Sequence, residues 1–174
     1  LPRRELIIVD VPGVGGSPLP KQPYRMSTIA ALGERVLARF DPKRADVLGV
    51  SWGGGVAQEF ARLYPQCCRR LILCATATGA LMIPAAPSVL WKMATPRRYM
   101  NRNYAREIAG DIYGGAFRDN PDLAATVYRH VRWQSPFGYY LQMAAGAGWT
   151  SVHWLHGLTQ PTLIMAGVDD PLIP

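Results

Sequence analysis

The stretch Val47-Leu48-Gly49-Val50-Ser51-Trp52-Gly53-Gly54-Gly55 decides the fold. It begins as a short apolar run typical of a buried strand and continues into a segment whose apolar residues recur at helical spacing. A serine at this junction fits a sharp, strained turn that projects its hydroxyl from the sheet edge. Gly49 and Gly53 then leave room for the strand and the helix to approach closely. The pattern predicts a nucleophile elbow with Ser51 as the nucleophile and the Trp52 amide as an oxyanion donor. A helix-capping serine in a glycine-rich turn is the alternative.

Strands and helices are expected to alternate around this turn. Residues 6–9 and 71–75 are further short apolar runs, and residues 27–40 and 53–64 carry apolar side chains at helical spacing. An order of strand, helix, strand, helix, strand predicts an α/β protein with a mainly parallel sheet. We expect residues 6–9 to form a strand that is buried on both faces.

The character of the chain changes after Gly79. Residues 80–158 show no strand alternation and are rich in Met, Trp, Tyr, Arg and Ala, whereas strand character returns at residues 162–166. We therefore divide the chain into a core (1–79), a helical lid insertion (80–158) and a return to the core (159–174). Five side chains of the insertion are candidate contacts for an apolar substrate, although packing inside the insertion explains most of them better: Trp91, Met93, Tyr139, Met143 and Trp149.

A pair of carboxylates follows the last predicted strand, in Gly167-Val168-Asp169-Asp170-Pro171. A serine hydrolase needs an acid that orients and stabilises its histidine, and in folds with this elbow the chain order is Ser, acid, His. We predict Asp170 as this acid, with Asp169 as the alternative, and a plain surface turn remains open.

The order Ser, acid, His places the catalytic histidine after Asp170, so we expect that it is not in this chain. His130, His153 and His156 all precede the acid, so none of them is assigned as the base.

A second glycine-rich loop, Asp10-Val11-Pro12-Gly13-Val14-Gly15-Gly16-Ser17, follows the first apolar run. It lacks the Lys-Ser/Thr pair of a phosphate-binding loop and does not lead straight into a helix. At the carboxyl edge of a sheet it would help to wall a pocket. A purely structural turn fits equally well.

Composition and charge limit the kinds of partner and cofactor that we expect. The 174 residues carry a net charge of +7, but the basic residues are scattered, and no spacing of a nucleic-acid-binding motif occurs. We therefore expect no nucleic-acid partner. No apolar run reaches membrane-spanning length, and Cys67, Cys68 and Cys74 form neither a disulfide framework nor a metal-site spacing. We expect a cytoplasmic protein with reduced thiols, no transmembrane segment, no metal and no organic cofactor.

The elbow and the two loops resemble those of α/β-hydrolases. The rest of the chain closely resembles the intracellular poly(3-hydroxyalkanoate) depolymerases that act on medium-chain-length polyester. The insertion is the informative part, because lids vary widely between hydrolase families. Its matching segments are Pro96-Arg97-Arg98-Tyr99, residues 111–118, Gly138-Tyr139-Tyr140, Gly148-Trp149-Thr150-Ser151 and residues 153–156.

The resemblance implies a serine ester hydrolase with Ser51 as nucleophile and Asp170 as triad acid, acting on polyester, with the storage-granule surface as a further partner. The family's strand with the first oxyanion loop, which would lie between residues 6–9 and the elbow strand, and its histidine have no counterpart here. We therefore expect a fragment, truncated at both ends and inactive alone. Two alternatives remain open: a lidded hydrolase of small esters or carbon–carbon bonds, and a non-catalytic binding module with this fold.

Overall fold

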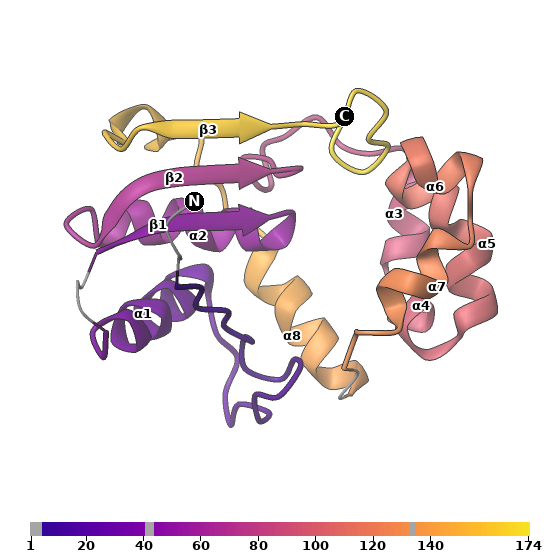
Figure 1. Cartoon of the computed structure of the whole chain (residues 1–174), viewed down its shortest axis with the longest axis horizontal. Coiled ribbons are helices and arrows are strands. Elements are labelled where there is room, and N and C mark those ends of the chain that lie inside the picture. Colours follow the sequence, from indigo (N-terminus) through magenta and orange to yellow (C-terminus); the bar gives the residue numbers. More distant parts are fainter. Residues whose placement is uncertain (1–4, 41–43, 133–134) are drawn as a thin grey trace.

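The computed structural model describes residues 5–40, 44–132 and 135–174. Within these ranges, three parallel strands form one sheet in the order β1 (Ala45–Val50), β2 (Cys68–Cys74) and β3 (Thr162–Met165). Their carboxyl ends share one edge, which faces a group of helices (Figure 1). The predicted α/β class with a parallel sheet is confirmed.

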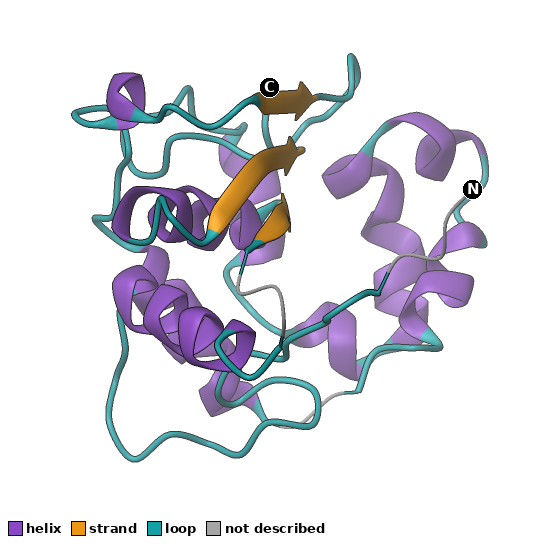
Figure 2. Ribbon diagram, turned by 60° about the vertical axis from the view of Figure 1, so that its left-hand side comes forward, coloured by secondary structure: helices purple, strands orange, loops and turns teal. Residues whose placement is uncertain are grey.

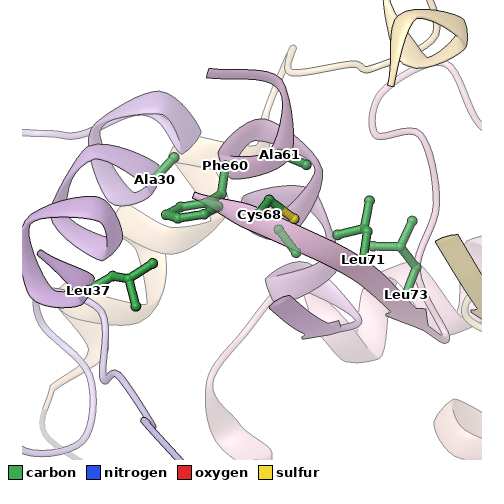
Figure 3. Close-up of a cluster of buried hydrophobic side chains, with 8 residues drawn as sticks. Ala30, Leu37, Phe60, Ala61, Cys68, Leu71 and Leu73 are labelled. Atoms are coloured by element: carbon green, nitrogen blue, oxygen red, sulfur yellow. The ribbon is translucent and has the colours of Figure 1, made fainter. Parts of the chain in front are cut away.

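Two helices, α1 (Met26–Leu37) and α2 (Trp52–Leu63), cover one face of the sheet (Figure 1). The side chains of β2 alternate, so that Leu71 and Leu73 point into this layer. They pack there with Phe60 and Ala61 of α2 and Leu37 of α1 (Figure 3). Fully burying a side chain such as Leu71 stabilises the fold by about 1.5–3 kcal/mol. This core therefore fixes the strand–helix junction that carries Ser51.

Residues 6–9 do not form the predicted strand. They have no regular secondary structure and are exposed, with Leu6 and Ile8 at 80% and 81% of their full accessible surface. An apolar run becomes a strand only where a neighbour pairs with its backbone. Among the described residues, the position beside β1 holds no further strand, so residues 6–9 have nothing to pair with.

Between residues 80 and 158 the described chain is largely helical. The elements are α3 (Pro87–Met93), α4 (Arg97–Met100), α5 (Arg102–Tyr113), α6 (Gly115–Asp119), α7 (Leu123–Tyr128), α8 (Pro136–Gly146) and the short 3-10 helix η1 (Leu155–Gly157). Helices α3–α7 gather beyond the carboxyl edge of the sheet, and α8 returns toward the core (Figures 1 and 2). Leu141 and Ala145 of α8 pack against Tyr24 and Ile29. We call residues 80–158 the lid.

The chain leaves and re-enters the core at one point. Gly79 and Thr150 form an antiparallel bridge, the Ala80 N–H donates to the Trp149 carbonyl at 2.7 Å, and the Ser151 N–H donates to the Thr78 carbonyl at 3.0 Å. Gly79 has φ +85°, and a Cβ there would collide with the Trp149 backbone. A glycine is therefore required where the two lid connections cross.

Packing explains three of the five candidate lid contacts. Tyr139 is buried and accepts a hydrogen bond from Arg98, Trp149 donates its indole N–H to Glu59 at 3.2 Å, and Met93 packs on the α3–α5 cluster. Trp91 and Met143 are exposed, at 81% and 42%. Of the five, these two are the most exposed.

None of the described helices has the length and apolar character that a membrane span requires.

Candidate active site

Ser51 occupies a strained turn between β1 and α2. Its φ of 51° and ψ of −124° lie in a region that side chains larger than glycine rarely adopt. The turn is fixed on both sides: the Ser51 N–H donates to the Cys74 carbonyl at 2.9 Å, and the Ser51 carbonyl accepts from Gly54 N–H at 2.8 Å and Thr76 Oγ1 at 2.7 Å. This is the geometry of the sharp elbow that the sequence predicts.

The close approach of strand and helix depends on Gly49 and Gly54. A Cβ at Gly49 would collide with the backbone of Gly53 and Gly54, and a Cβ at Gly54 would collide with the Thr76 side chain. A Cβ at Gly53 would meet nothing within 4 Å. The structure thus assigns the second close contact to Gly54 rather than to Gly53.

Trp52 is the first residue of α2, where backbone N–H groups have no partner inside the helix. Such amides at a helix N-terminus favour a developing negative charge. The Trp52 indole is held by the lid, because its Nε1–H donates to the Gln142 carbonyl of α8 at 3.0 Å. The side chain of the predicted oxyanion donor is therefore held by a contact with the lid.

The two carboxylates after β3 have different partners. Asp170 is half-buried, and its Oδ1 accepts the N–H groups of Leu172 and Ile173, both at 2.9 Å. Asp169 turns to the lid, where its carboxylate accepts the Gly115 N–H at 2.8 Å and Arg118 Nη1 at 2.7 Å. The hydrogen bond from Gly115, together with the Arg118 guanidinium, holds the pKa of Asp169 below its usual value. Asp169 is thus engaged by the lid, which leaves Asp170 as the better candidate for the triad acid.

Ser51 and Asp170 follow strands β1 and β3, so both lie at the carboxyl edge of the same sheet with β2 between them. The three histidines do not join them as buried partners, because His130, His153 and His156 are all exposed. No group of three metal-ligating side chains occurs within the ranges that the structure describes.

The Asp10 loop is held by its own hydrogen bonds. The Asp10 carboxylate accepts the Gly16 N–H at 2.8 Å, and the Ser17 hydroxyl donates to the Asp10 carbonyl at 2.7 Å. Gly13 packs closely against Gly138 of α8. The loop is a structural turn that also supports the lid, and it borders a hollow of about 340 Å³ that Ser51 does not line.

Sequence reasoning missed Thr76, Gly115 and Arg118. Thr76 fixes the elbow from the end of β2, and the other two hold the acid loop, which we define as residues 167–171. A polar residue directly after a strand at the site edge is the one local signal that could have indicated Thr76.

The strained turn at Ser51 on a parallel sheet is typical of the α/β hydrolases. Residues 1–174 match the α/β hydrolase fold family, and the chain belongs to it. Over 173 residues the chain is 53% identical to the poly(3-hydroxyalkanoate) depolymerase of Ectopseudomonas oleovorans, covering 99% of this chain and 61% of that protein. The chain thus spans about three fifths of the length of that relative.

Solved structures give the same fold. A meta-cleavage product hydrolase from Pseudomonas fluorescens superposes with a TM-score of 0.72 at 19% identity, over 95% of this chain and 62% of its own. A hydrolase from Pseudomonas aeruginosa gives a TM-score of 0.71 at 23% identity, over 94% and 62%. At these identities the likeness shows the fold alone.

Proposed function

We propose that the complete protein carrying this chain is a serine ester hydrolase that cleaves poly(3-hydroxyalkanoate) polyester through an acyl-enzyme on Ser51. The observation that carries the proposal is the strained turn at Ser51, with φ 51°, between a parallel strand and a helix. The 53% identity to a poly(3-hydroxyalkanoate) depolymerase supports the substrate class. We infer the cytoplasmic storage-granule surface as the place of action.

The proposed reaction has two halves. Ser51 Oγ attacks the ester carbonyl carbon while a histidine from outside this chain takes the hydroxyl proton. The Trp52 amide and a second donor outside this chain hold the oxyanion. The carbon–oxygen ester bond then breaks, and the leaving alcohol receives the proton. Water adds to the acyl-enzyme in the same way, releasing the acid and restoring the Ser51 hydroxyl. Asp170 orients the histidine and stabilises its charged form.

A fluorophosphonate probe tests the nucleophile. The complete protein should take the label once, and Ser51→Ala should abolish it. Ser88→Ala is the matched control, because Ser88 is exposed in the first turn of α3 and lies outside the site. If the wild-type protein takes no label, Ser51 is not an activated nucleophile, and the non-catalytic binding module becomes the better interpretation.

Substrate class needs a second measurement. Release of 3-hydroxyacids from medium-chain-length polyester granules should exceed hydrolysis of soluble p-nitrophenyl esters at equal ester concentration. The reverse order would favour a hydrolase of small esters. Residues 1–174 expressed alone should show no esterase activity, because the proposed histidine lies outside them; measurable turnover by this piece would contradict the assignment of the base.

A further inference from the structure

The acid loop is attached to the lid through Asp169. Its carboxylate accepts the Gly115 N–H at 2.8 Å, and Arg118 Nη1 reaches its two oxygens at 2.7 and 3.0 Å. We call these three hydrogen bonds the Asp169 contact. They join residues that are 51 and 54 positions apart in the chain. The contact therefore belongs to the tertiary structure and not to the local turn.

Close packing accompanies these hydrogen bonds. Gly114 has φ +63°, and a Cβ there would collide with the Asp169 carbonyl and approach the Pro171 ring. On the other side of Asp170, Leu172 packs against the lid cluster that contains Ile108 and Ile112. Contacts with the lid thus lie on both sides of Asp170. Figure 1 shows the C-terminal loop beside α6.

Within the described part of the chain, the Asp170 carboxylate accepts no hydrogen bond from the lid. Its Oδ1 accepts only from Leu172 and Ile173, which belong to the same turn. Those bonds set the carboxylate relative to the loop, but they do not set the loop relative to the rest of the molecule. That second task falls to the residues on either side of it.

We propose that Asp169 is a positioning residue that holds Asp170 in its working place by docking the acid loop on lid helix α6. The inference rests on the proposed function, since it gives Asp170 the role of triad acid. The position of the Asp170 carboxylate then depends on contact between the acid loop and α6. The pair Asp169–Arg118 is half exposed, so it contributes little to global stability. Its effect is expected in catalysis instead.

The test compares phosphonylation of Ser51 in the complete protein with Asp169→Asn and Arg118→Ala. Each change should lower the second-order rate of labelling about ten-fold, the size of a typical coupling between linked sites. The double variant should be no slower than Asp169→Asn alone, because the two hydrogen bonds from Arg118 are part of the Asp169 contact. The unfolding midpoint should stay where it is in the wild type.

The pH profile supplies a readout that a merely structural role would not change. A well-placed carboxylate raises the pKa of its histidine, so a displaced Asp170 lowers it. The acidic limb of the labelling rate should therefore move to lower pH in Asp169→Asn.

Arg106→Ala and Asp122→Asn are the matched controls. They remove an ion pair of the lid with the same 2.7 Å separation and similar exposure, remote in sequence from the acid loop. Both should label at the wild-type rate.

Two results would overturn the inference: wild-type labelling rates in Asp169→Asn, or an equal loss in the control variants. Neither would touch the proposed role of Ser51 as nucleophile, which fails if the wild-type protein itself is not labelled there.

Discussion

Replacing Ser51 by glycine should give a more stable protein than replacing it by alanine, although both changes abolish hydrolysis. Ser51 has φ 51° and ψ −124°, a conformation that costs a residue with a Cβ about 1–3 kcal/mol. Glycine adopts it without that cost but loses about 0.5–1 kcal/mol more in conformational entropy on folding. Taking the middle of each range, we expect Ser51→Gly to be more stable than Ser51→Ala by about 1 kcal/mol.

Urea unfolding of the complete protein, followed by circular dichroism, measures this difference. Ser51→Ala is the reference, because it removes the hydroxyl and keeps the strained Cβ. Ser88 supplies the control pair: at this exposed position in α3 the order should reverse, with Ser88→Gly less stable than Ser88→Ala by about 0.5–1 kcal/mol. If Ser51→Gly unfolds at the same urea concentration as Ser51→Ala or below it, strain is not stored at the elbow.

Two further predictions concern the same layer of the structure. Gly54→Ala should destabilise the protein by about 1–3 kcal/mol, because its Cβ collides with Thr76, whereas Gly53→Ala, whose Cβ meets nothing within 4 Å, should not destabilise it; equal unfolding midpoints for the two variants would contradict this assignment. Burial raises the pKa of the Cys68 thiol from 9.0 to about 11, with the Asp46 carboxylate adding to the shift. Between pH 9 and 11 the thiol keeps its proton in the folded protein but loses it in the unfolded chain. The contribution of the buried Cys68 thiol to the free energy of unfolding is therefore complete below pH 9 and is lost as the pH rises through about 11. Urea titrations across that interval should show the loss in the wild type and a smaller one in Cys68→Ala.

The elbow was predictable because its determinants are local. An apolar strand, a serine between glycines and an amphipathic helix follow one another within residues 45–63, and β1, Ser51 and α2 appear where the pattern places them. Strands β2 and β3 likewise cover the predicted apolar runs, although β2 begins earlier, at Cys68, and ends before Ala75. Ala75 leaves the strand with φ 44°.

The features that were not predictable depend on partners far away in the chain. The apolar run at residues 6–9 has the composition of a strand, but a strand also needs a neighbour, which composition does not report. Likewise, the choice between Gly53 and Gly54 depends on where Thr76 arrives at the end of β2. The different partners of Asp169 and Asp170 depend on Arg118, in a lid helix that no local pattern connects to the acid loop.

The contacts between lid and core differ in kind, and so in the free energy that breaking them would cost. At its base, backbone hydrogen bonds join Gly79 and Ala80 to residues 149–151, and α8 buries Leu141 and Ala145 against the core. Breaking the backbone hydrogen bonds leaves polar groups unpaired, and moving α8 exposes apolar surface. Each change costs on the order of 1–3 kcal/mol in free energy. The Asp169 contact is an exposed ion pair with one amide, and such ion pairs contribute about 0–1 kcal/mol. We therefore expect the Asp169 contact to separate more readily than α8, with the packing of Leu172 on the lid cluster as the further contribution that opposes separation there.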